Sequence, residues 1–192
     1  MTIILRPPTH FDALESLPVI GALAVSLALQ SEFEIMAKVR WPNDVTFSGR
    51  KLGGTLAEGK FSGNDLEHVL LGLGLNANFS RELIAAQAVP ATTTQDILGH
   101  DVDKAELISS ILLELERLYE EASAGESRQI LALLRQNELS LGKRVEMQFE
   151  RGILTGVLED YEKLSTVRVR DDLGNVQSVE TSHLVYVAYH DD

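Results

Sequence analysis

Glycine recurs inside two consecutive predicted strands of this 192-residue chain, and no other feature restricts the fold as much. Gly53 and Gly54 follow a hairpin turn, and Gly72 and Gly74 alternate in the apolar run HVLLGLGLNANF. Glycine inside a strand costs stability and marks a bulge or a close approach by a ligand or another backbone. Because strand residues two apart face the same way, Gly72, Gly74 and Asn76 share one face. The sequence predicts a sheet face cleared of side chains, with an amide at its end.

The segment RWPNDVTFSGRK precedes the first glycine pair and brings several polar groups close together in sequence. Asp44, after the Trp-Pro corner, could hold a divalent cation, and Lys51, after a Ser-Gly turn, could neutralise a phosphate or a carboxylate. Asn76 could bind a polar heterocycle. Each group also has a structural interpretation, since Pro-Asn-Asp is a common turn and glycines can serve close sheet packing.

The composition excludes several classes of protein. A net charge of −12 and a pI near 4.8 argue against a nucleic-acid binder, which needs a dense cationic surface. The absence of cysteine excludes disulfides, zinc-thiolate sites and thiol catalysis, and favours a cytoplasmic protein. We expect no signal peptide after Met1 and no membrane span, because the most apolar predicted helix, Leu17 to Gln30, is too short.

The periodicity predicts an α+β fold of two domains, residues 1–139 and 140–192. The first would contain an edge strand at Thr2 to Leu5, the helix Leu17 to Gln30 started by Ser16 and Pro18, and a strand from Ile35 to Arg40. The glycine-bearing strands follow. Two further helices would run from an Asp103 cap to about Ala124 and from about Ser127 to Leu139.

The second predicted domain consists of short alternating strands. We expect five, at Arg144 to Gln148, Gly152 to Asp160, Thr166 to Arg170, Val176 to Val179 and His183 to Val187, with one turn at Glu162-Lys163. Five short strands in so few residues are typical of a small SH3-like β-barrel.

In combination and order, RWPNDV, GRKLGGTLAE and LLGLGLNAN resemble the biotin protein ligases. The segment PATTTQDILG is similar to the part of that family that precedes its long helix, and the strands after LGKRVEMQF resemble the family's C-terminal SH3-like domain. The resemblance implies a class II synthetase-like mixed sheet with helices. It also implies an enzyme that uses ATP and Mg²⁺ to activate biotin as biotinyl-AMP and passes it to a lysine of a biotin carboxyl carrier protein.

The resemblance also implies roles for individual residues. Asp44 would help to place the Mg²⁺ that bridges the nucleotide phosphates, and Asn43 would support the corner. Lys51 would contact the biotin carboxylate and the α-phosphate, and Asn76 would hydrogen-bond the adenine. The remaining predicted substrate-binding residues are Trp41, Gly53, Gly54, Gly72 and Gly74.

The sequence departs from the family pattern in two places. Arg40 stands where the family usually has lysine before WPND, and no GRGRxGR segment, the family's biotin-binding loop, occurs in the chain. We therefore expect the N-terminal part of the catalytic domain to be missing. The edge strand Thr2 to Leu5 would then be covered by an N-terminal ligase chain or by a second copy.

Two other functions remain open from the sequence. One is a non-catalytic nucleotide-binding or biotinyl-AMP-binding regulatory module, which would keep the same residues without turnover. The other is lipoate ligation, a sister chemistry on a related fold, although the Trp-Pro pair and the SH3-like tail are more similar to the biotin branch.

Overall fold

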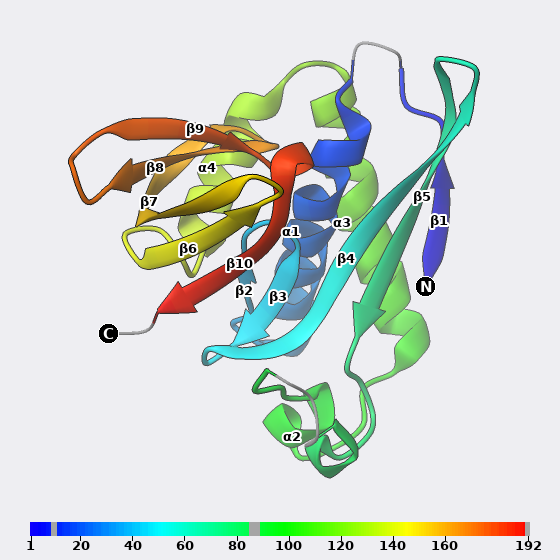
Figure 1. Cartoon of the computed structure of the whole chain (residues 1–192). Coiled ribbons are helices and arrows are strands. Elements are labelled where there is room, and N and C mark those ends of the chain that lie inside the picture. The colour runs from blue at the N-terminus through cyan, green and yellow to red at the C-terminus, as the bar shows by residue number, and fades with distance from the viewer. Residues whose placement is uncertain (9–10, 85–88, 191–192) are drawn as a thin grey trace.

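The computed structural model describes residues 1–8, 11–84 and 89–190 and contains two five-stranded antiparallel sheets (Figure 1). The first sheet has the order β1-β5-β4-β3-β2. Its strands are β1 (Thr2–Leu5), β2 (Lys38–Arg40), β3 (Asp44–Phe47), β4 (Arg50–Ser62) and β5 (Asp65–Leu75). Parallel contacts in the described residues are the isolated bridges Val39–Glu138 and Lys51–Ala91. The predicted α+β class is confirmed.

Helix α1 (Ala13–Phe33) packs against one face of the first sheet and differs from its prediction. It begins four residues before Leu17 because the Ser16 amide already donates to the Asp12 carbonyl at 3.1 Å, so Pro18 lies inside the helix. At 21 residues α1 is long and apolar enough to cross a membrane, so the prediction that it is too short was wrong. Its most apolar stretch is 72% buried, however, as in the core helix of a globular fold.

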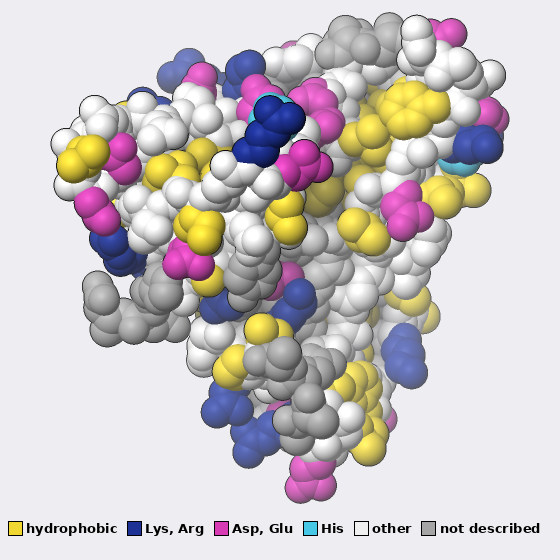
Figure 2. All heavy atoms as spheres, viewed as in Figure 1, with side chains coloured by type: hydrophobic (Ala, Val, Ile, Leu, Met, Phe, Trp, Pro, Cys, Tyr) yellow, Lys and Arg dark blue, Asp and Glu magenta, His cyan; other side chains and the backbone are white. Residues whose placement is uncertain are grey.

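The two faces of the first sheet differ sharply. Thr55 points toward α1, since its hydroxyl donates to the Pro18 carbonyl at 2.5 Å, and its cross-strand partner Leu73 is buried on the same side. The opposite face, here called the open face, carries Gly54, Leu56, Gly72 and Gly74. Figure 2 looks onto this face and shows pale backbone in the middle of the sheet with exposed hydrophobic side chains near it.

The other helices are α2 (Thr94–Leu98), α3 (Lys104–Ser123), α4 (Ser127–Asn137) and the short 3-10 turns η1 (Arg81–Ile84) and η2 (Thr181–His183). Asp103 caps α3 as predicted, because its carboxylate accepts from the Ala105 amide at 2.7 Å. Helix α3 packs on α1, so the two helices form a layer behind the first sheet (Figure 1). The turn η1 was not predicted.

The second sheet contains the five strands expected from the alternating pattern. They are β6 (Arg144–Phe149), β7 (Gly152–Lys163), β8 (Thr166–Asp171), β9 (Val176–Glu180) and β10 (Leu184–His190), in the order β10-β6-β7-β8-β9. The turn predicted at Glu162-Lys163 lies instead at the next two residues, since β7 continues to Lys163. The sheet is consistent with an SH3-like domain, although the described strands do not close into a barrel.

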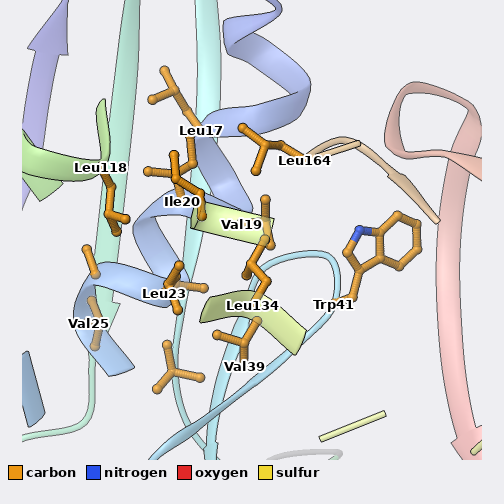
Figure 3. Close-up of a cluster of buried hydrophobic side chains, with 14 of the residues drawn as sticks. Leu17, Val19, Ile20, Leu23, Val25, Val39, Trp41, Leu118, Leu134 and Leu164 are labelled. Atoms are coloured by element: carbon orange, nitrogen blue, oxygen red, sulfur yellow. The ribbon is translucent and has the colours of Figure 1, made fainter. Parts of the chain in front are cut away.

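The buried side chains of both sheets form one continuous core. Figure 3 shows Leu164, from the turn after β7, in one cluster with Leu17 and Val19 of α1 and Leu134 of α4. All of these side chains are almost completely buried. The second sheet therefore shares its interior with the first part of the chain, and the boundary between residues 139 and 140 stays a prediction.

Candidate active site

A cavity of about 670 Å³ lies on the open face of the first sheet. Every predicted site residue except Trp41 lines it, so the structure brings together groups from β3, β4 and β5. The lining residues are Met1, Thr2, Asn43, Asp44, Lys51, Gly53, Gly54, Thr55, Leu56, Gly72, Leu73, Gly74, Leu75 and Asn76. The sequence did not predict six of these lining residues, which are Met1, Thr2, Thr55, Leu56, Leu73 and Leu75. The pairing of Thr2 with Gly72, which only the sheet order reveals, puts β1 beside the cavity.

An ion pair between Asp44 and Lys51 stands at one side of this cavity. The two residues come from neighbouring strands, and the register of β3 against β4 shifts between Val45 and Thr46. The backbone of Lys51 is fixed on its other side, because its amide donates to the Pro90 carbonyl at 2.9 Å and its carbonyl accepts from the Thr92 amide at 2.9 Å. The side chains of Asp44 and Lys51 remain 23% and 36% exposed, so a ligand can reach both charges.

The glycines that line the cavity do not all serve one purpose. A Cβ at Gly72 or Gly74 would meet only a carbonyl oxygen at 3.7 Å, so side chains would fit sterically and would project into the cavity. A Cβ at Gly54 would lie 3.2 Å from Asp44 Oδ1, beside the ion pair. At Gly53 the Cβ would lie 2.5 Å from the Gly74 carbonyl oxygen, which is too close. Gly53 is therefore required by strand packing, whereas Gly72 and Gly74 leave space over the sheet.

The two asparagines of the cavity are held by the backbone. Asn43 donates its side-chain amide to the Thr55 carbonyl at 2.7 Å, while its own carbonyl accepts from the Thr55 amide at 2.9 Å. Asn76 donates to the Thr92 carbonyl at 3.1 Å, which orients the amide at the end of β5. Both side chains are thus fixed at the edge of the cavity before any ligand binds.

Trp41 does not line this cavity. Its side chain is 1% exposed, its indole N–H is buried without a hydrogen-bond partner among the described residues, and its peptide bond to Pro42 is cis. It lines a second cavity of about 740 Å³, between the first sheet and β10, which shares Asn43, Asp44, Lys51 and Leu56 with the first. The indole is therefore part of the scaffold beside the site, and its predicted contact with substrate stays a prediction.

The donor set fits a magnesium ion that is held largely by a ligand. Among the described residues no group of three or more His, Asp or Glu side chains could enclose a metal. Asp44 offers one partly exposed carboxylate next to a cavity large enough for a nucleotide. Mg²⁺ is commonly bound by one or two carboxylates together with substrate phosphates and water, so a single aspartate suits such an ion.

Comparison with known proteins agrees with this geometry. The family model described as the biotin/lipoate A/B protein ligase family matches residues 4–76. The bifunctional ligase/repressor BirA of Bacillus subtilis is 27% identical over 161 residues, which cover 81% of this chain and 48% of that protein. A biotin–[acetyl-CoA-carboxylase] ligase of Paracoccus denitrificans is 32% identical over 111 residues, covering 56% of this chain and 46% of the relative. The matches thus span about half the length of these curated relatives.

The solved structures agree over almost the whole chain. The apo biotin protein ligase of Aquifex aeolicus has a TM-score of 0.84 at 25% identity, covering 98% of this chain and 81% of that one. The Aquifex enzyme in complex with biotin and ATP has a TM-score of 0.82, also at 25% identity, covering 98% of this chain and 77% of that one. The fold and the family model therefore support a similarity to the biotin/lipoate protein ligases. The ligases of Paracoccus and Aquifex named above are biotin ligases, so within that class the similarity of this chain is to the biotin protein ligase family.

Proposed function

We propose that this chain carries the catalytic platform of a biotin protein ligase acting in the cytoplasm. The platform would join biotin and ATP into biotinyl-AMP and transfer the biotinyl group to a lysine of a biotin carboxyl carrier protein. The observation that supports this proposal most strongly is the Asp44–Lys51 ion pair beside a cavity floor kept bare by Gly72 and Gly74. The Asp44 and Lys51 charges lie next to strand backbone that no side chain covers. Such a site suits a ligand with an anionic phosphate in its middle and ring systems at its two ends.

The first step would be an attack of the biotin carboxylate on the α-phosphorus of ATP. A carboxylate oxygen forms the new bond to phosphorus, and the bond to the bridging oxygen breaks as pyrophosphate leaves. Two anions must be brought together, so positioning and charge neutralisation dominate the catalysis. The Lys51 ammonium, which lines the cavity, would neutralise the oxygens that meet there, and Asn76 at the end of β5 would hydrogen-bond the adenine.

The second step would be an attack of a neutral lysine amine on the carbonyl carbon of biotinyl-AMP. An amide bond forms, the bond to the phosphate oxygen breaks, AMP leaves, and the amine gives up a proton to solvent or a carboxylate. Lys51 would stabilise the phosphate oxygens of the departing AMP as it had stabilised them in the anhydride. Asp44 would hold the Mg²⁺, which supplies positive charge to the nucleotide phosphates when it is bound.

We further propose that residues outside this sequence complete the biotin side of the site. The sequence contains no GRGRxGR segment, and β1 is one of the two edge strands of the first sheet as described. On the open face of β1 the side chain of Ile4 is 58% exposed, and Leu56 of β4 is 57% exposed. An unpaired strand edge beside exposed apolar side chains favours another strand as the neighbour. An N-terminal ligase polypeptide is the favoured occupant, and a second copy of this chain is the alternative.

The test is biotin-dependent release of pyrophosphate from Mg·ATP, with and without an N-terminal ligase polypeptide that carries the arginine-rich loop. We expect Lys51→Ala to lower the rate about 100-fold or more, as expected when one stabilising charge is lost. Lys60→Ala is the matched control, since Lys60 is an exposed residue of the same strand and lies outside the cavity. We expect Lys60→Ala to retain the wild-type rate.

The outcomes separate the candidate functions. Release by the chain alone would mean that no second polypeptide is needed for adenylation. Release only in the mixture would support a split enzyme. Binding of biotin and nucleotide with no release in either arm would favour the non-catalytic module, and faster release with lipoate than with biotin would favour the lipoate branch.

A further inference from the structure

Trp41 is held on both sides of its backbone by side chains that are distant in sequence. Its amide N–H donates to Glu138 Oε1 at 3.3 Å, and its carbonyl accepts a hydrogen bond from the hydroxyl of Tyr189 on β10. The guanidinium of the preceding residue, Arg40, lies 5.2 Å from the centre of the Tyr189 ring. The corner that leads into Asn43 and Asp44 is therefore anchored to the second sheet.

Glu138 is the centre of this anchor. It follows α4 directly, and the adjacent Leu139 amide donates to the Val39 carbonyl at 2.8 Å, which places Glu138 next to β2. Its carboxyl group accepts from the Trp41 amide at 3.3 Å, the Ser140 amide at 2.9 Å and the Tyr161 hydroxyl at 2.5 Å. All three partners are donors, which is the environment that an ionised carboxylate requires because it can only accept.

Stability alone is a poor explanation for this carboxyl group. Burial raises the pKa of Glu138, while the hydrogen bonds from Tyr161 and Ser140 lower it and offset part of the cost. Taking an ionised group out of water is expensive, and apolar residues of similar volume are often at least as stabilising in such positions. A buried glutamate that bonds to the backbone of a site corner points instead to a role in placing that corner.

The position of the Trp41 corner determines the position of the Asp44–Lys51 ion pair, because the segment that connects them is short and held by hydrogen bonds. Only Pro42 and Asn43 separate Trp41 from Asp44, and Asn43 is itself fixed to Thr55 by two backbone-directed hydrogen bonds. Asp44 then begins β3 and contacts Lys51. We infer that a shift of the Trp41 backbone would also shift the Asp44 carboxylate, because the two residues between them are held in place.

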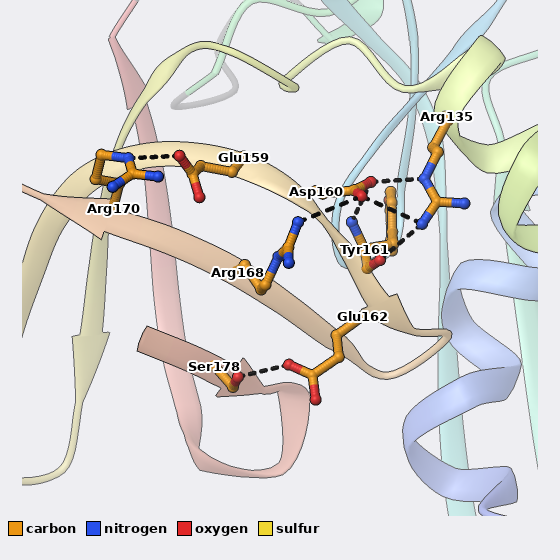
Figure 4. A network of polar contacts seen from close by, with 8 residues as sticks. All are labelled: Arg135, Glu159, Asp160, Tyr161, Glu162, Arg168, Arg170 and Ser178. Carbon is orange, nitrogen blue, oxygen red and sulfur yellow. Dashed lines mark hydrogen bonds and ion pairs between the residues drawn. The ribbon is translucent and has the colours of Figure 1, made fainter. Parts of the chain in front are cut away.

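The groups behind Glu138 are themselves fixed. Tyr161 lies on β7, where the Arg135 guanidinium of α4 donates to the Tyr161 carbonyl at 2.9 Å and to Asp160 Oδ1 at 2.6 Å (Figure 4). The Tyr161 side chain is 1% exposed. The chain of contacts thus runs from α4 and β7 through Tyr161 and Glu138 to the Trp41 backbone.

We propose that Glu138 is a positioning residue, which acts with Tyr161 and Tyr189 to set the geometry of the Asp44–Lys51 pair from the second sheet. This inference rests on the proposed function, because the affected ligand is the magnesium nucleotide. Residues that orient a metal-binding group from behind commonly change affinity or activity 10- to 100-fold when they are replaced. Glu138 would determine how well the site accepts Mg·ATP and have little effect on biotin alone.

The test compares Glu138→Gln with wild type in the full chain. Glutamine has the size of glutamate, but its NH₂ group cannot accept, so either the Tyr161 hydroxyl must turn to accept from it or a backbone amide of Trp41 or Ser140 loses its acceptor. We expect the Kd for Mg²⁺ with α,β-methylene-ATP, which cannot be cleaved at the reacting bond, to rise about tenfold, while the Kd for biotin stays within about twofold. Glu159→Gln is the matched control, since Glu159 lies on the same strand as Tyr161 but pairs with Arg170 on the surface. It should leave both constants unchanged.

Intrinsic fluorescence gives a second readout that needs no ligand. Trp41 is the only tryptophan of the chain, so its emission reports this corner alone. We expect Glu138→Gln and Tyr189→Phe to shift the emission and Glu159→Gln to leave it as in wild type. Tyr189→Phe also serves if Glu138→Gln does not fold, because it removes only the hydroxyl that binds the Trp41 carbonyl.

Two results would overturn the inference. One is a folded Glu138→Gln or Tyr189→Phe variant with wild-type emission. The other is a shifted emission with an unchanged Kd for the magnesium nucleotide, which would make the contact purely structural. If wild type binds neither nucleotide nor biotin, the proposed function fails instead, while the emission measurement still decides whether Glu138 controls the corner.

Discussion

Asp44 and Lys51 form a partly exposed ion pair, and such pairs contribute little to stability, typically about 0 to 1 kcal/mol. Their value therefore lies in what they can bind. Before a ligand arrives, each charge neutralises the other. Anionic phosphates would compete for Lys51, and a magnesium ion would compete for Asp44. The ion pair between the two side chains would then be replaced by one contact from Lys51 to a phosphate and one from Asp44 to the metal.

The variant Asp44→Asn should separate binding from folding. We expect the Kd for Mg²⁺ with α,β-methylene-ATP to rise about tenfold or more, because the carboxylate ligand is lost. The free energy of unfolding should change by less than about 1 kcal/mol. Calorimetric titration and urea unfolding measure the two quantities. Asp65→Asn at the exposed tip of the β4–β5 hairpin is the control, and a large loss of stability with unchanged affinity would contradict the prediction.

Glu15, at the start of α1, gives a pH-dependent prediction. A hydrogen bond with Asp12, burial and the nearby charges of Asp12 and Glu180 raise the pKa of Glu15 from 4.5 to about 7. The folded state therefore binds more protons than the unfolded state between these two values, and stability falls as the pH rises through that window. We expect Glu15→Gln to make the melting temperature less dependent on pH there, whereas Glu32→Gln, exposed near the end of α1, should not. An unchanged pH profile in Glu15→Gln would contradict the assignment.

The β4–β5 hairpin is the element that creates the site, and its glycines give a matched pair of substitutions. Gly53→Ala would push a Cβ to 2.5 Å from the Gly74 carbonyl, so we expect it to destabilise the fold by about 2 kcal/mol, as substitutions that strain the backbone do. Gly72→Ala meets nothing closer than 3.7 Å and should be neutral or stabilising by up to about 1 kcal/mol. Urea unfolding of both variants checks this difference, and equal effects would refute it.

Much of this element was predictable from its sequence. The turn at Ser48-Gly49 and the alternation that puts Gly72, Gly74 and Asn76 toward one side follow from local patterns, whereas the contact between Asp44 and Lys51 is shown only by the structure. Strand alternation and turn chemistry are local properties, so a short window of sequence contains them. The five strands of the second sheet were predictable for the same reason.

The remaining features depend on contacts between distant segments. Nothing near Trp41 indicates that it would be buried beneath β10, and nothing near Glu138 indicates a partner that lies 97 positions away. The early start of α1 was missed because the turn at Asp12 outweighs the usual preference of proline for the first helical position. The sequence alone does not distinguish Gly53, which close strand packing requires, from Gly72, which leaves space over the sheet, because this difference depends on the strand register.

At the scale of the whole molecule, the shared core and the Glu138 contacts predict that the two sheets unfold together. We expect one urea transition, with the same midpoint when it is followed by Trp41 fluorescence at the junction and by far-ultraviolet circular dichroism over the whole chain. The predicted boundary between residues 139 and 140 would then separate two sheets of one cooperative unit. Two transitions, with Trp41 reporting only the first, would mean that the sheets are independently stable domains.

The central claim is that the glycine-floored cavity beside Asp44 and Lys51 binds the activated biotin. Calorimetric titration of the full chain with a non-hydrolysable biotinyl-AMP analogue tests this claim most directly, comparing wild type with Gly74→Val. A Cβ at this position would lie 3.7 Å from the nearest atom, so we expect the strand to accept the β-branched valine and its methyl groups to project over the cavity floor. We predict that wild type binds the analogue and that Gly74→Val, equally stable, does not. Equal binding by both proteins would place the ligand elsewhere and contradict the account.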